Sequence, residues 1–167
     1  MAELLKRFFQ ICLLAKGPQD IPHSDILMRM LLVVYFITGM LSMLPTVEMQ
    51  QAVMEMALDL VVLLAFVWAC LQAFHKQARY VQTLSALAGV GALFQLLAWP
   101  LLAYLEAGRQ AGDPVSELSL LLLLIVSWNL AVYAHIFRES FNIRMLAAFI
   151  MTIAYAVINI SVRQILY

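Results

Sequence analysis

The chain contains 167 residues, of which 65% are hydrophobic and 12% are charged, whereas an ordinary soluble domain has roughly 25% charged and 45–50% apolar residues. This apolar excess excludes a water-soluble globular domain and indicates an integral membrane protein. Ten basic and ten acidic residues leave no formal net charge, so no overall field attracts nucleic acid and we expect no nucleic-acid partner.

The first residues of the chain predict an amphipathic helix on the membrane surface. Leu4, Phe8 and Ile11 recur at helical spacing, while basic residues such as Lys6 and Arg7 fall on the opposite face. A helix with one apolar and one basic face lies at the interface between lipid headgroups and acyl chains. We therefore expect this helix to lie in the plane of the membrane.

The stretch GPQDIPHSD joins this helix to the first long apolar run. Gly17 is a natural helix stop, and Ser24 or Asp25 can cap the next helix. We interpret the stretch as a hinge that turns the chain from the membrane plane into the bilayer. A second interpretation stays open, because the same stretch holds the residue types of an acid–base cluster, namely Asp20, His23 and Asp25.

Five apolar stretches approach or exceed the roughly 20 residues that a helix needs to cross a bilayer. They lie at about 26–44, 52–74, 81–105, 116–137 and 145–166. The connections between them are too short for a water-exposed domain. The predicted fold is an all-α integral membrane protein with five transmembrane helices, preceded by an amphipathic interfacial N-terminal helix. Residues 1–25 form the helix and hinge, and residues 26–167 form the five-helix bundle.

Lys and Arg are distributed unevenly between the two ends of the predicted spans. The end that contains the N-terminus holds Lys6, Arg7, Lys16, Arg29, Lys76, Arg79, Arg138 and Arg144, and the other end holds Arg109 and Arg163. Because these residues accumulate in cytoplasmic loops, we expect the N-terminus in the cytoplasm and Tyr167 on the opposite side. Short loops and the lack of a cleavable signal favour a bacterial inner membrane, with the C-terminus in the periplasm.

Asp59 is the polar residue of the predicted spans whose burial in the membrane costs the most free energy. An ionisable group at membrane depth is by default a candidate functional residue. Asn159 and Arg163, in the last span, fall at comparable depth in the outer part of the bilayer. An Asp59–Arg163 ion pair that also binds Asn159 would satisfy all three side chains. We interpret this set as a strut between two helices, and the alternative is a relay for protons or substrate.

Gln95, Ser127 and Asn129 form a second predicted polar set, nearer the midplane of the bilayer. Such side chains either hydrogen-bond neighbouring helices or line a pathway. The more common case is packing between helices, which we favour here.

Small residues recur four positions apart in the span at 81–105. Ser85 pairs with Gly89, and Ala88 pairs with Ala92. Small residues at this spacing allow two membrane helices to approach closely. We expect this span at the centre of the bundle or at a subunit interface.

Three histidines are predicted at the cytoplasmic interface, together with several carboxylates. Glu139 follows His135 by one helical turn, so the two share a helix face. Convergence of these groups would create a site for a divalent metal or haem. We favour isolated interfacial residues that bind headgroups, backbone or carboxylates, and we expect no metal and no cofactor. The candidate set is Asp20, His23, Asp25, His75, His135 and Glu139.

These features predict a non-catalytic accessory or assembly subunit of the inner membrane. Its partners would be the lipid bilayer and either further copies of the chain, in a homo-oligomer, or another membrane protein. The alternative is a small transporter or channel, which requires one cavity lined by Asp59, Gln95, Asn129 and Asn159. A third hypothesis is a membrane enzyme or metal site at the cytoplasmic face near His23.

Overall fold

The computed structural model describes residues 2–111 and 116–166. Within these residues every regular element is helical, and five helices are long and apolar enough to cross a membrane. The predicted all-α membrane fold is therefore confirmed.

The elements follow the predicted order along the chain. They are α1 (Ala2–Cys12), the 3-10 turn η1 (Pro18–Asp20), α2 (Asp25–Met43), α3 (Met49–Ala73), the 3-10 turn η2 (Gln77–Arg79), α4 (Tyr80–Ala111), α5 (Ser116–Phe141) and α6 (Met145–Leu166). The largest difference from the predicted spans is at α4, which continues helical through Pro100 and ends at Ala111 instead of residue 105.

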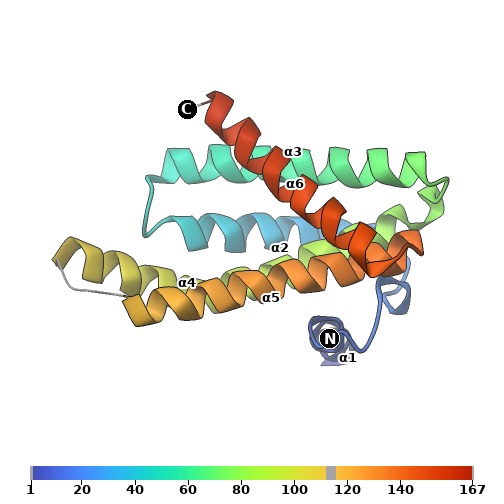
Figure 1. Cartoon of the computed structure of the whole chain (residues 1–167), viewed down its shortest axis with the longest axis horizontal. Coiled ribbons are helices and arrows are strands. Elements are labelled where there is room, and N and C mark those ends of the chain that lie inside the picture. The colour runs from blue at the N-terminus through green and yellow to red at the C-terminus, as the bar shows by residue number, and fades with distance from the viewer. Residues whose placement is uncertain (1, 112–115, 167) are drawn as a thin grey trace.

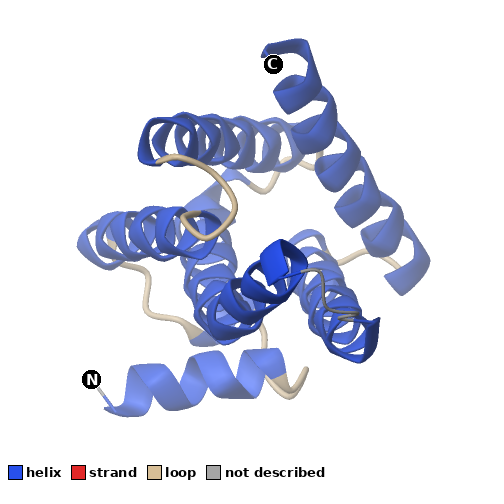
Figure 2. Cartoon of the chain, turned by 90° about the vertical axis from the view of Figure 1, so that its left-hand side faces the viewer, coloured by secondary structure: helices blue, strands red, loops and turns tan. Residues whose placement is uncertain are grey.

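The five long helices close into a ring. Helix α2 packs against α3 and α4, α4 packs against α5, α5 against α6, and α6 returns to α3. Figure 1 shows α6 crossing the bundle obliquely, and Figure 2 shows the ring along the helix axes. The bundle has two ends. We call the end with α1, the α3–α4 connection and the α5–α6 connection the α1 end, and the opposite end the C-terminal end.

Helix α4 carries the small residues in its first half, which is buried within the bundle, while much of its second half is exposed. Ser85, Ala88 and Gly89 are buried, and α4 packs against α1, α2, α3 and α5. The sequence predicted this span either at the centre of the bundle or at a subunit interface. The small residues are covered by helices of the same chain, as in the first of these alternatives. The small side chains allow four other helices to approach one backbone.

Helix α1 runs crosswise to the spans and packs on α4 and α5 (Figure 2). Its Ile11 is fully buried, and its Phe8 ring lies over Gly89, where an added Cβ would come within 2.3 Å of a ring carbon. The Nε1 of Trp128 on α5 donates a hydrogen bond to the Cys12 carbonyl at 3.0 Å. The apolar face of α1 is thus turned toward protein.

Helix α1 ends earlier than the sequence indicates. Its last residue is Cys12, and Leu14 adopts a left-handed φ of 58° that reverses the chain. The Ala15 amide then donates to the Gln10 carbonyl at 2.9 Å, as in a Schellman motif. The expectation that Gly17 stops the helix is wrong, because Gly17 has a φ of −116° and caps η1 instead.

The stretch after α1 is held in place by hydrogen bonds. The Gly17 amide donates to Asp20 Oδ2 at 3.0 Å, and Arg7 donates to the Asp20 carbonyl at 2.5 Å. Ser24 caps α2 by accepting a hydrogen bond from the Leu27 amide at 3.3 Å. These contacts fix the direction in which the chain enters the first span.

Candidate functional site

Asp59 lies at the centre of a buried polar network that joins three helices. It sits on α3 with 7% of its surface exposed. Tyr35 of α2 donates to Oδ2 at 2.5 Å, and Tyr155 of α6 donates to Oδ1 at 3.2 Å. Asn159, one turn after Tyr155, also donates to Oδ1. Burial of a carboxylate in a membrane protein requires such donors.

Arg163 adds a positive charge to this network but shares it with a second carboxylate. Its Nη2 lies 3.9 Å from Asp59 Oδ1, and its Nη1 donates to Glu55 Oε2 at 3.1 Å. Gln51 donates to the other oxygen of Glu55 at 2.8 Å. The structure therefore brings Asp59, Asn159 and Arg163 together and adds Glu55, one turn before Asp59 on α3.

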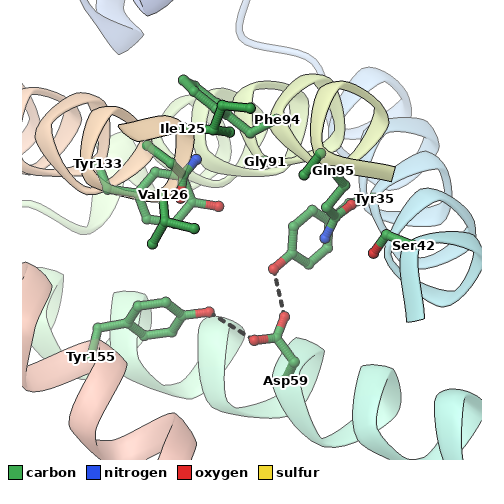
Figure 3. A pocket seen from close by; sticks show the side chains of 12 residues that line it. Tyr35, Ser42, Asp59, Gly91, Phe94, Gln95, Ile125, Val126, Tyr133 and Tyr155 are labelled. Atoms are coloured by element: carbon green, nitrogen blue, oxygen red, sulfur yellow. Dashed lines mark hydrogen bonds between the residues drawn. The ribbon is translucent and has the colours of Figure 1, made fainter. Parts of the chain in front are cut away.

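A pocket of about 270 Å³ opens beside Asp59, between the helices of the ring (Figure 3). All five long helices contribute to its wall, so it is the interior of the ring. The lining consists of Tyr35 and Ser42 from α2, Asp59 from α3, Gly91, Phe94, Gln95 and Ala98 from α4, Ile125, Val126, Asn129 and Tyr133 from α5, and Tyr155 from α6.

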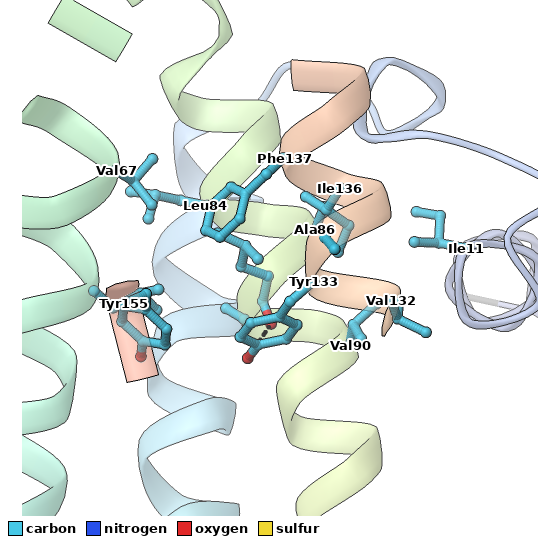
Figure 4. Close-up of a cluster of buried hydrophobic side chains, with 14 of the residues drawn as sticks. Ile11, Val67, Leu84, Ala86, Val90, Val132, Tyr133, Ile136, Phe137 and Tyr155 are labelled. Atoms are coloured by element: carbon cyan, nitrogen blue, oxygen red, sulfur yellow. Dashed lines mark hydrogen bonds between the residues drawn. The ribbon is translucent and has the colours of Figure 1, made fainter. Parts of the chain in front are cut away.

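Large apolar side chains close this pocket toward the α1 end. Leu63, Val67, Leu84 and Phe137 have no exposed surface and pack just beyond the level of Asp59 and Tyr133. Figure 4 shows this cluster with Tyr133 and Tyr155 at its border. Elsewhere in the wall, Val126 on α5 is 47% exposed. The pocket thus lies in mid-bundle with one sealed end.

Gly91 creates the space in which two tyrosines meet. An added Cβ there would lie 2.5 Å from a Tyr35 ring carbon and 2.6 Å from the Tyr133 hydroxyl. Tyr133 donates to the Leu87 carbonyl at 3.3 Å, and its ring centroid lies 6.3 Å from that of Tyr155. A bulkier residue at position 91 would force these rings into the pocket.

The two polar sets expected from the sequence form one site, apart from Ser127. Gln95 and Asn129 line the same pocket as Asp59. Gln95 Oε1 accepts a hydrogen bond from Thr38 at 2.6 Å, while Asn129 makes none with the residues that the structure describes. Asn159 donates to Asp59 but does not line the pocket, so three of the four residues named for the transporter alternative share this cavity.

Ser127 does not belong to this pocket. It is exposed on α5, and its hydroxyl donates to the Leu123 carbonyl one turn earlier at 2.7 Å. A serine that satisfies its own hydroxyl in this way can face lipid at little cost. Its position two residues before Asn129 therefore gave no information about the side it faces.

The candidate histidine cluster assembles only in part. Lys16, Asp20, His135, Arg138 and Glu139 border a polar pocket of about 300 Å³ at the α1 end, where His135 Nε2 lies 3.0 Å from the Lys16 carbonyl. The other residues of the candidate set are His23, Asp25 and His75. All three are exposed, and none lines this polar pocket. Within residues 2–111 and 116–166, no group of three or more His, Cys, Asp or Glu could hold a metal ion.

The tyrosines and Glu55 were not singled out from the sequence. Tyr35 and Tyr155 stand in apolar runs, where a tyrosine is commonly a packing residue or an interfacial anchor. One signal was present, because both fall near the middle of their spans, where a hydroxyl needs a partner. Counting the depth of every hydroxyl, as for Asp59, would have made both tyrosines candidates, although it would not have shown which side they face.

No protein-family model, curated protein or solved structure matches this chain. The arrangement of the side chains therefore carries the functional argument. The pocket presents a carboxylate that can accept a proton or a cation, surrounded by hydroxyl and amide groups that can orient a ligand.

Proposed function

We propose that the protein is a small membrane transporter or channel whose binding site is the central pocket, with Asp59 as the group that takes up a proton or a cationic solute. One observation supports this above all. Asp59, Gln95 and Asn129 come from three different helices and line one pocket. A purely structural strut would not need an open space beside its carboxylate.

The accessory-subunit hypothesis stays a prediction, but the small residues of α4 no longer support it. It depended partly on small residues that would form an interface with a partner. Ser85, Ala88 and Gly89 are covered by other helices of the same chain. A homo-oligomer, or a complex with another membrane protein, would have to use the apolar outer surface, where Leu124 is 63% exposed.

We further propose a bacterial inner-membrane location with the α1 end in the cytoplasm. The eight basic residues counted from the sequence belong to elements at this end, whereas Arg109 and Arg163 belong to the C-terminal ends of α4 and α6. The positive-inside rule then places α1 at the cytoplasmic interface. In this orientation the sealed end of the pocket faces the cytoplasm.

Proton flux into proteoliposomes tests the proposed transport. Purified protein is reconstituted with a pH-sensitive dye inside, and a potassium diffusion potential drives proton entry. We expect flux above that of empty liposomes, and we expect Asp59→Asn to reduce it to that background, because the amide cannot carry the proton. Ser127→Ala is the matched control, since Ser127 lies at similar depth outside the pocket, and it should leave the flux unchanged.

Two results would contradict the transport proposal. The first is wild-type flux equal to that of empty liposomes. The second is undiminished flux in Asp59→Asn with a lowered melting temperature, which would assign Asp59 a structural role alone.

A further inference from the structure

The charges around the pocket do not balance. Glu55 and Asp59 carry two negative charges when ionised, and Arg163, which contacts both, carries one positive charge. Glu55 and Arg163 do not line the pocket themselves, and the described residues that do line it include no Lys, Arg or His. The site is therefore one positive charge short, and in a low-dielectric interior such an imbalance is costly. One bound monovalent cation, or one proton, removes it.

Asp59 also keeps an acceptor position free on the side of the pocket. Oδ1 receives Tyr155 and Asn159 and lies near Arg163, whereas Oδ2 accepts only from Tyr35 within the described part of the chain. A carboxylate has about four lone-pair sites. Oδ2 can thus contact a further positively charged group.

The rest of the lining suits an organic cation better than a metal ion. Tyr35, Tyr133, Tyr155 and Phe94 place aromatic rings around the pocket (Figure 3). Aromatic rings bind ammonium groups through their negative faces, and cages of such rings recognise quaternary ammonium ligands. Apolar neighbours such as Ile125 favour alkyl groups, while a metal ion would require several more oxygen ligands.

We propose that the pocket binds one small organic ammonium ion, whose charge Asp59 balances and whose alkyl groups contact Tyr35, Tyr133 and Tyr155. This inference rests on the proposed function and names the substrate class of the same site. The cation and a proton compete for the Asp59 carboxylate, so the bound cation is released when the carboxylate is protonated.

The competition with protons predicts how binding depends on pH. The titratable and charged groups that face Asp59 are Tyr35 from α2, Glu55 from α3, Tyr133 from α5, and Tyr155 and Arg163 from α6; the α4 part of the lining has none. Tyrosine and arginine keep their protons at acidic and neutral pH. The carboxylates thus govern the pH dependence, and binding should weaken as pH falls.

Choline is a suitable probe, because its quaternary ammonium group is charged at every pH. We would titrate choline into the purified full-length protein in detergent by calorimetry. The control ligand is 3,3-dimethyl-1-butanol, which has nearly the same shape without the charge. We expect choline to bind, the neutral analogue to bind at least about tenfold more weakly, and choline binding to weaken as pH is lowered.

Two variants connect this binding to the pocket. Asp59→Asn should weaken choline binding by about tenfold or more and remove its pH dependence. Gly91→Ala leaves every charge in place but pushes Tyr35 and Tyr133 into the pocket, so it should also weaken binding, even if Asp59→Asn fails to fold. Ser127→Ala should bind like the wild type.

The outcomes separate this inference from the proposed transport. Equal binding of choline and the neutral analogue, or wild-type affinity in Gly91→Ala, would overturn the ammonium site. Asp59-dependent proton flux without choline binding would leave the transport proposal standing and refute the substrate class. Choline binding that depends on Asp59 and Gly91, with neither proton flux nor choline flux in proteoliposomes, would support the ammonium site and refute transport.

Discussion

At the scale of single residues, Asp59 is the shared acceptor of side chains from α2 and α6. Replacement by alanine would leave the hydroxyls of Tyr35 and Tyr155, the Asn159 amide and the Arg163 guanidinium without this acceptor. Loss of one partner of a buried ion pair typically costs about 3–5 kcal/mol. We expect Asp59→Ala to lower the free energy of unfolding by this amount and Asp59→Asn to lower it less. Denaturant unfolding in detergent micelles measures both.

The unfolding measurements need a control variant at similar depth whose substitution changes stability little. Ser127→Ala removes an exposed hydroxyl that bonds only within its own helix, so its effect should stay within about 0.5 kcal/mol. If Asp59→Ala unfolds like this reference, the network contributes no stability and its geometry serves ligand binding alone.

The same residues show what depth along a span can predict. Asp59, Asn159 and Arg163 could be grouped from the sequence because residues at equal depth on two spans can meet once the spans pack side by side. Depth does not give the direction in which a side chain points. Ser127 was therefore grouped with Asn129, although the two positions, two residues apart on a helix, face different surroundings.

At the scale of elements, the Phe8 ring is one of the contacts that hold α1 to the bundle. Phe8 is 5% exposed and occupies the space above Gly89. Burial raises the pKa of the Cys12 thiol, one turn further along α1, to about 11. Because the thiolate is the reactive form, Cys12 should react slowly with maleimide at neutral pH, and its reaction rate should rise with pH.

Phe8→Ala tests this attachment. Without the ring, α1 should loosen and Cys12 should return toward the ordinary thiol pKa, which increases the labelling rate by about tenfold for each unit of pKa recovered. The rates are measured by mass spectrometry in a Cys70→Ala background. Leu5→Ala on the exposed side of α1 is the control and should label like the parent. Equal rates in the Phe8 and Leu5 variants would show that the ring does not hold α1.

The long helices could be predicted because length and hydropathy suffice to identify a membrane span. Their pairing could not, since lipid-facing and buried positions are equally apolar: Leu84 is fully buried, whereas Leu124 is 63% exposed. The end of α1 was also predicted wrongly. Gly17 was the expected helix stop, but the chain turns three residues earlier at Leu14, in a left-handed conformation that a leucine rarely adopts.

At the scale of the whole molecule, the bundle is asymmetric along its axis. The α1 end is filled by large buried side chains such as Phe137 and Phe141 and is covered by α1. The pocket beside Asp59 lies on the other side of this packed region. The orientation in the membrane therefore decides which compartment each side of the packed region faces. With α1 in the cytoplasm, as proposed, the pocket lies on the periplasmic side of the packed region.

Reporter fusions test this orientation in a bacterial host. Green fluorescent protein folds in the cytoplasm, and alkaline phosphatase becomes active only after export. We expect fluorescence from a fusion at the N-terminus and phosphatase activity from a fusion after Tyr167, because basic residues concentrate at the α1 end and five spans put the two termini on opposite sides. Matching fusions in the connection between α3 and α4, next to His75, should report the cytoplasm. Phosphatase activity at that connection would invert the topology, and the pocket would then lie on the cytoplasmic side of the packed region.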